Sequence, residues 1–109
     1  MILANMKENG MEIKECNSLE EVRNEIDKID EEIVRLIAQR SKYVKQAARF
    51  KESVEEIKSD ERINDVLNHV RHLAATLGIS PNLVADIFKI LIDKMVEMEI
   101  EEFKNGGAY

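Results

Sequence analysis

Two positive charges interrupt the apolar face of a predicted helix in the first half of the chain. The apolar side chains of this face recur at alternating steps of four and three residues: Val22, Ile26, Ile29, Ile33 and Leu36. The same steps continue to Arg40 and, eleven residues after it, to Lys51. At about 100° and 1.5 Å per residue, the two cations lie about 20° apart around the helix and roughly 16 Å apart along it. Because inward-facing cations need anionic partners, this face predicts nearby carboxylates, belonging either to the protein or to a ligand.

A carboxylate, Glu99, interrupts a second apolar face in the same way. The side chains of that face are Val84, Ile87, Phe88, Leu91, Ile92 and Met95. Desolvation there favours the neutral form of Glu99, whereas a nearby Lys51 favours the ionised form, so the sequence leaves its protonation state open. For any one of these charged residues, a satisfied salt bridge at a subunit interface is the simpler explanation.

Two further arginines strengthen the case for a ligand. Arg23 lies in the first predicted helix, and Arg62 lies in the first turn of the next one. Together with Arg40 and Lys51 they make four cations, which outnumber the single inward acid. A site short of negative charge suits a ligand with more than one carboxylate, because a guanidinium group binds a carboxylate through two hydrogen bonds at once.

The sequence predicts neither a metal site nor a bound cofactor. His69 and His72 have the spacing of two ligands on one helix. No Cys or carboxylate set completes a coordination shell at convincing spacing, so we expect both histidines at the surface.

Three predicted helices and no strand carry these residues, so the fold class is all-α. Ser18 and Glu21 form an S-x-x-E capping box, after which the first helix runs from about residue 19 to residue 51 or slightly beyond. The segment 52–58 loses the helical periodicity and is predicted as a loop. Its acidic residues are either solvated or folded over a site as a lid, and the residue types favour the first interpretation.

The two shorter helices have clear boundary signals. The second begins near Ser59 and ends at Gly78, a residue typical of the position after a helix. The third, of medium length, has Ser80 as its N-cap and Pro81 as its first residue. The first helix alone would span about 50 Å, which is longer than a compact chain of this size is wide. We therefore expect an obligate oligomer, and a dimer with intertwined long helices covers the apolar face best.

Composition limits the possible functions. The 109 residues fit one helical domain, 17–109, preceded by an arm, 1–16, that we expect to be flexible. Met6 and Met11 could each serve as an alternative start, and the sequence leaves this open. A net charge of −6 argues against a nucleic-acid partner. No apolar run approaches the ~18 residues of a membrane span, and we recognise no secretory signal. The single cysteine fits a reducing, cytoplasmic setting.

The segment 18–51 resembles the first helix of the all-helical (type II) chorismate mutases. The resemblance rests on the run RNEIDKIDEEIVRLIAQR, with Lys51 in register after it, and covers roughly residues 18 to 103. The runs RFKES, IKSDERI and GISPNLVADIFKILI look closest to the isochorismate pyruvate lyase branch of the same fold. Members of the family form an intertwined homodimer with two equivalent sites and use neither metal nor cofactor.

The resemblance also implies a role for each charged residue. Arg40 would bind one substrate carboxylate, and Arg23 would reach into the site of the other protomer. Lys51 would donate to the ether oxygen of the enolpyruvyl group. Arg62 matches the family's cation at the start of the second helix. Glu99 falls where many members carry Gln as the second donor to that oxygen, and some carry Glu.

Two departures from the family pattern affect recognition of the substrate's ring hydroxyl. Ile63 stands where chorismate mutases often carry Glu, and the lyase branch also has an aliphatic residue there. Met95 stands where some mutases have a small polar residue. We expect a chorismate mutase, and the main alternative is an isochorismate pyruvate lyase of the salicylate and siderophore route. An alternative of another class is a non-catalytic helical dimer that serves as a regulatory or interaction module.

Overall fold

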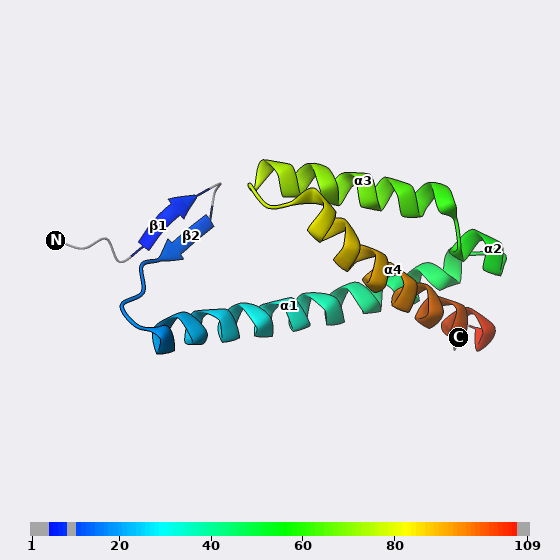
Figure 1. Cartoon of the computed structure of the whole chain (residues 1–109). Coiled ribbons are helices and arrows are strands. Elements are labelled where there is room, and N and C mark those ends of the chain that lie inside the picture. Colours follow the sequence, from blue (N-terminus) through cyan, green and yellow to red (C-terminus); the bar gives the residue numbers. More distant parts are fainter. Residues whose placement is uncertain (1–4, 9–10, 107–109) are drawn as a thin grey trace. The chain divides into compact units, whose positions relative to one another are not determined.

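A computed structural model describes residues 5–8 and 11–106 of the chain. The chain divides into two compact units, Met1–Ala38 and Gln39–Tyr109, and the boundary between them falls within the longest helix. The three predicted helices are present, so the all-α class is confirmed (Figure 1). In the part of the chain that the structure describes, no helix is both long enough and apolar enough to cross a membrane.

A short antiparallel hairpin precedes the helices, where we predicted no strand. β1 (Asn5–Glu8) pairs with β2 (Met11–Lys14), and Met6 lies opposite Ile13 in the register. Residues 1–4 and 9–10 of the predicted flexible arm lie outside the described residues, and the flexibility of the arm stays a prediction. The prediction that the arm has no strand was wrong.

The long helix α1 (Leu19–Ala47) begins at the predicted capping box. The Glu21 N–H donates to Ser18 Oγ at 3.1 Å, and the Asn17 N–H donates to Glu21 Oε2 at 2.9 Å. None of the residues of α1 is buried within this chain, although its apolar face is continuous. Ile26, Ile29 and Ile33 are 50%, 57% and 48% exposed.

The first helix ends earlier than predicted. A short 3₁₀ helix, η1 (Ala48–Phe50), follows α1, and Lys51 has an extended backbone with φ −93° and ψ 144°. Packing explains the change from α-helical to 3₁₀ geometry, because Ala48 is only 3% exposed and η1 lies against the last helix. Lys51 therefore does not continue the helical face that carries Arg40.

Three further helices complete the unit Gln39–Tyr109. They are α2 (Val54–Ile57), α3 (Asp60–Thr76) and α4 (Pro81–Lys104). The predicted caps are confirmed: Ser59 Oγ accepts from the Arg62 N–H at 3.2 Å, and Ser80 Oγ accepts from the Leu83 N–H at 3.2 Å. Gly78 has φ 76°, a left-handed conformation that glycine adopts without steric cost.

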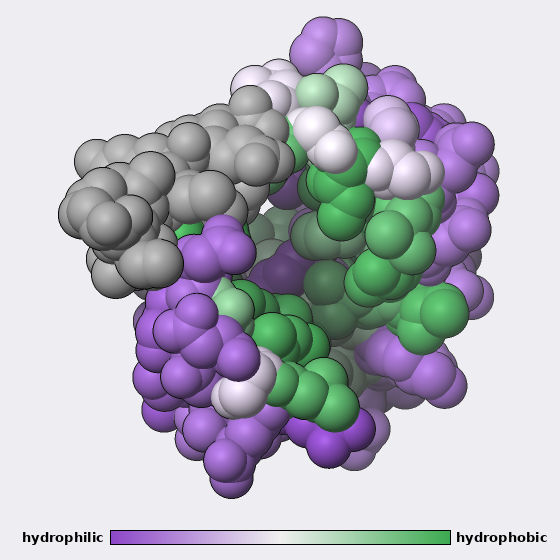
Figure 2. Space-filling view, turned by 60° about the vertical axis from the view of Figure 1, so that its left-hand side comes forward, coloured by the Kyte–Doolittle hydropathy of each residue, from purple (hydrophilic) through white to green (hydrophobic). Residues whose placement is uncertain are grey.

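The core of this unit lies where α3 and α4 pack on each other, with α2 and η1 also against α4 (Figure 1). The buried apolar side chains are Ala48, Ile57, Leu67, Val70, Ala74, Ala85, Ile92 and Met95. Hydrophobic side chains also remain exposed over a wide area of the surface seen in Figure 2. On α4 these include Leu83, Ile87 and Ile90.

Candidate active site

A cleft of about 670 Å³ opens in the unit Gln39–Tyr109, and its size suits a small organic ligand. Its charged lining consists of Arg40, Lys51, Arg62, Glu56 and Glu99. Most of the remaining lining is apolar and includes Val44, Ile57, Ile63, Val66, Ile92 and Met95. The cleft therefore combines apolar walls with a few converging charges, as ligand sites commonly do.

The cleft brings together four of the five predicted site residues. Arg40 comes from the end of α1, Arg62 from the first turn of α3 and Glu99 from the second half of α4. Lys51 reaches the same cleft from its extended link rather than from a helix face. The fifth residue, Arg23, lies on α1 in the other unit and is exposed, and it does not line the cleft.

Lys51 and Glu99, which both line the cleft, form an ion pair. The Lys51 Nζ lies 2.8 Å from Glu99 Oε2. The Glu99 side chain is only 9% exposed and the Lys51 side chain 28%. An ammonium group has three donors, so Lys51 keeps two for other acceptors while it contacts Glu99.

Arg40, by contrast, has a weak partner. Its Nη1 lies 2.7 Å from the thioether sulfur of Met95, which accepts hydrogen bonds poorly. Burial lowers the pKa of Arg40, and the nearby positive charge of Arg62 lowers it further. Among the residues that the structure describes, neither Arg40 nor Arg62 forms an ion pair. The cleft thus holds two guanidinium groups without carboxylate partners, as a site for an anionic ligand requires.

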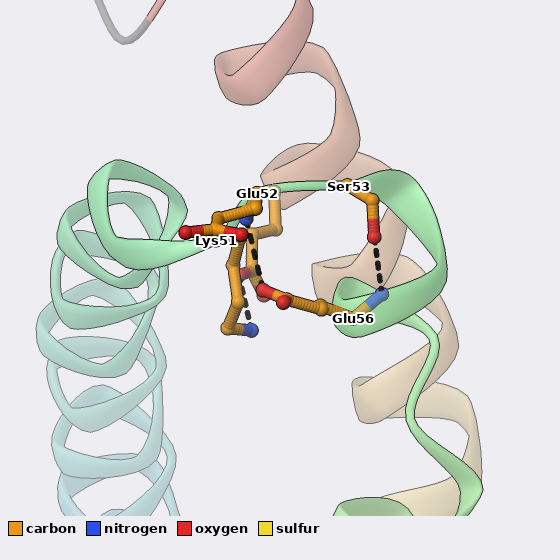
Figure 3. Close-up of polar contacts among 5 residues, drawn as sticks. Lys51, Glu52, Ser53 and Glu56 are labelled. Carbon is orange, nitrogen blue, oxygen red and sulfur yellow. Dashed lines mark hydrogen bonds and ion pairs between the residues drawn. The ribbon is translucent and has the colours of Figure 1, made fainter.

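The segment after Lys51 contains the short helix α2, and two of its residues, Glu56 and Ile57, line the cleft. Ser53 caps α2 by accepting the Glu56 N–H at 3.3 Å, and Glu56 Oε2 accepts the Glu52 N–H at 2.9 Å (Figure 3). The prediction of a loop over 52–58 was therefore wrong for Val54–Ile57, which form α2. The signal was present in the sequence, because Ser53 and Glu56 have the same S-x-x-E spacing as Ser18 and Glu21.

The two histidines lie on α3, and both are exposed. Within residues 5–8 and 11–106, the structure has no group of three or more His, Cys, Asp or Glu side chains arranged to hold a metal ion.

The family model for type II chorismate mutase matches residues 22–100 of the chain. The chain belongs to this family. It is 31% identical over 91 residues to the isochorismate pyruvate lyase of Pseudomonas aeruginosa, an alignment that covers 84% of this chain and 90% of the relative. It is 32% identical over 91 residues to the chorismate mutase of Methanocaldococcus jannaschii, which covers 80% of this chain and 92% of the relative. The resemblance to this enzyme family is confirmed.

Proposed function

We propose that the chain is a chorismate mutase that converts chorismate to prephenate. The carrying observation is the pair of guanidinium groups without carboxylate partners, Arg40 and Arg62, beside the Lys51–Glu99 pair in an apolar cleft. Chorismate is a dicarboxylate, and its rearrangement is pericyclic. The reaction needs no nucleophile and no redox group, so the protein has to hold the folded conformer and stabilise charge on the ether oxygen.

In this proposal each charged side chain has a distinct task. Arg40 binds one substrate carboxylate, and Arg62 contributes further positive charge close to this carboxylate clamp. Lys51 donates to the ether oxygen as negative charge grows there, using a donor that Glu99 leaves open. Glu99 is the second donor to that oxygen when it carries a proton. Its other oxygen then still accepts from Lys51.

The active assembly in this proposal is a homodimer whose sites use both chains. Arg23 of one copy completes the cleft of the other. Covering the apolar face of α1 favours such assembly, since full burial of a large aliphatic side chain stabilises by about 1.5–3 kcal/mol. About half of the surface of each of five such side chains on α1 is exposed. Burying these surfaces in both copies would stabilise the dimer by on the order of 10 kcal/mol. The five side chains are Val22, Ile26, Ile29, Ile33 and Leu36. Association costs about 4–15 kcal/mol in lost freedom, which is comparable to this gain, so burial of exposed apolar residues of α4 would stabilise the dimer further.

An isochorismate pyruvate lyase is the second candidate. Ile63 and Met95, which stand at the two departures from the mutase pattern, both line the cleft. Ile63 has no side-chain group that can hydrogen-bond the ring hydroxyl of the substrate, and Met95 offers only a weak sulfur acceptor. Elimination of pyruvate from isochorismate needs nearly the same clamp and the same donor to the ether oxygen, so one cleft can serve either reaction.

A non-catalytic helical module requires a different charge pattern. Its inward cations would be neutralised by acids of the protein. Glu99 does this for Lys51, but among the described residues no carboxylate does it for Arg40. The unpaired guanidinium therefore favours an enzyme. A cytoplasmic setting and a role in aromatic amino acid biosynthesis follow from the proposed activity.

The deciding experiment offers the purified protein chorismate and isochorismate separately and identifies the products. We expect prephenate from chorismate. The matched control is the Lys51→Met variant, which keeps the length of the side chain and removes the donor. Formation of pyruvate and salicylate from isochorismate, with chorismate unchanged, would favour the lyase. No turnover of either substrate would contradict both assignments.

A further inference from the structure

Among the charged residues that line the cleft, Lys51 is the one that lies between two helical segments rather than on a helix. It forms part of the short link between η1 and α2, with φ −93° and ψ 144°. If the backbone torsion angles of such a link change, the lysine side chain points in another direction. The structure should therefore contain contacts that hold this backbone in place.

Hydrogen bonds restrain both peptide groups of Lys51. On one side, its own N–H donates to the Ala48 carbonyl oxygen at 3.3 Å. On the other side, the N–H of Glu52 belongs to the peptide that follows Lys51 and donates to Glu56 Oε2 at 2.9 Å (Figure 3). The first hydrogen bond joins two backbone groups, as is usual at the end of a helix. The second depends on the Glu56 side chain.

Glu56 is itself held in place by its neighbours. Its N–H donates to Ser53 Oγ at 3.3 Å, and the next residue, Ile57, is only 5% exposed and anchors α2 against α4. Ala48, 3% exposed, anchors η1 against the same helix. Lys51 thus lies between two anchors on α4, the helix that also carries its ion-pair partner Glu99.

We propose that Glu56 is a positioning residue for Lys51. By holding the Glu52 N–H, its carboxylate fixes the backbone from which the Lys51 ammonium group reaches into the cleft. The effect on turnover rests on the proposed function, because Lys51 matters to rate only if it donates to the reacting oxygen. Glu56 itself makes no contact with the reacting atoms in this proposal.

A purely electrostatic role for Glu56 makes a different prediction. Glu56 lines the cleft, and its negative charge opposes a dicarboxylate ligand. If charge were its function, Glu56→Gln and Glu56→Ala would act alike. If the hydrogen bond is its function, Gln restores what Ala removes, since an amide oxygen also accepts from an N–H.

The test compares Glu56→Ala, Glu56→Gln and the control Glu55→Ala in the full chain. Glu55 lies on the same helix, carries the same charge and does not line the cleft. For each protein we would measure kcat and KM with chorismate and the melting temperature. Independently of turnover, we would measure acetylation of Lys51 by acetic anhydride in the ligand-free protein, with Lys58 as the internal reference.

We expect Glu56→Ala to lower kcat by about 10- to 100-fold, the scale of a displacement of roughly 1 Å at a catalytic group, with a smaller change in KM. Acetylation of Lys51 should rise several-fold relative to Lys58, because the ammonium group is no longer held beside Glu99. Glu56→Gln should return both values close to those of the wild type, and Glu55→Ala should change neither.

Unchanged kcat and unchanged acetylation in Glu56→Ala would overturn the proposal, as would a Gln variant as impaired as the Ala variant. If Glu56→Ala loses its cooperative melting transition, Ser53→Ala replaces it, since that change loosens the same turn. A Ser53→Ala protein with neither effect would also overturn the proposal. If the wild type turns over neither substrate, the proposed function fails, and the acetylation alone decides whether Glu56 holds Lys51.

Discussion

The N-terminal part of α1 and the body formed by residues 39–104 use similar apolar patterns with opposite results. On α1, Ile26, Ile29 and Ile33 are about half exposed, at 50%, 57% and 48%. In the body, Val70 and Met95 are 7% and 4% exposed, because α3 and α4 cover each other. Periodicity alone therefore identifies an apolar face but not the chain that covers it. In the proposed function, the face of α1 contacts a second copy of the chain, and the cleft carries out the reaction.

Charge on the face of α1 should have the largest effect. A double variant, Ile29→Asp with Ile33→Asp, places unpaired carboxylates where the second copy would pack, which costs several kcal/mol per buried ion. We expect loss of the dimer in sedimentation equilibrium together with loss of turnover. The control, Asn24→Asp, adds a charge on another side of the same helix and should leave both unchanged. A monomeric double variant with full activity would contradict the claim that the active site needs a second copy packed on the face of α1.

Lys51→Ala should have the next largest effect, and its effect on turnover should fall on the chemical step. Loss of one donor to a developing negative charge lowers kcat/KM by about 10²- to 10³-fold. Most of the loss should fall on kcat, because the oxygen gains its charge only in the transition state. The dimer should persist, and Lys58→Ala, which removes an exposed lysine outside the cleft, should behave as the wild type. A rise in KM with kcat unchanged would make Lys51 a binding residue instead.

Arg40→Leu should weaken binding without weakening the fold. A lost charged hydrogen bond corresponds to a roughly 10- to 100-fold rise in KM. Burial and Arg62 lower the pKa of Arg40, which means that the ligand-free cleft disfavours its charge. The melting temperature of the ligand-free variant should therefore be no lower than that of the wild type. Arg35→Leu, at an exposed arginine of α1, is the control and should leave KM unchanged. A marked loss of thermal stability in Arg40→Leu would show that Arg40 is a structural residue.

Glu99→Gln should have the smallest effect at neutral pH and a clear one at alkaline pH. If protonated Glu99 donates a hydrogen bond to the ether oxygen, Gln supplies a hydrogen-bond donor at every pH, so the decline of kcat/KM on the alkaline side should flatten. If Glu99 is only an ionised partner of Lys51, Gln loses the ion pair and gains nothing at high pH. Measurements of kcat/KM from about pH 4 to 9 for the wild type and the Gln variant distinguish the donor role from the ion-pair role. An unchanged profile would exclude the donor role.

Much of the helical fold was predictable because its signals are local. Ser18, Ser59 and Ser80 cap helices through side-chain oxygens three residues before the N–H groups that they accept, and Gly78 ends a helix through its own backbone freedom. The hairpin was also signalled, since Asn9-Gly10 is a dipeptide typical of two-residue hairpin turns. The missed capping box at Ser53 and Glu56 belongs to the same group of local signals.

The early end of α1 was not predictable in this way. Nothing in the run Ala48-Arg49-Phe50 breaks a helix, and the change to a 3₁₀ turn depends on packing of Ala48 against α4. The partner of Arg40 depends on tertiary structure as well, because Met95 lies 55 residues away in the chain. Four predicted site residues still meet, because Lys51 reaches the cleft by another backbone route.

The central claim, that each site needs both chains, is tested most directly by mixing two inactive proteins. Assayed with chorismate well below its KM, where the rate follows kcat/KM, Arg23→Ala and Arg40→Ala should each be nearly inactive alone. After subunit exchange, each heterodimer has one site with both arginines and one site with neither. An equal mixture should therefore regain about a quarter of the wild-type activity, given random pairing in a two-fold symmetric dimer. No recovery, when native mass spectrometry shows that heterodimers have formed, would contradict the shared site.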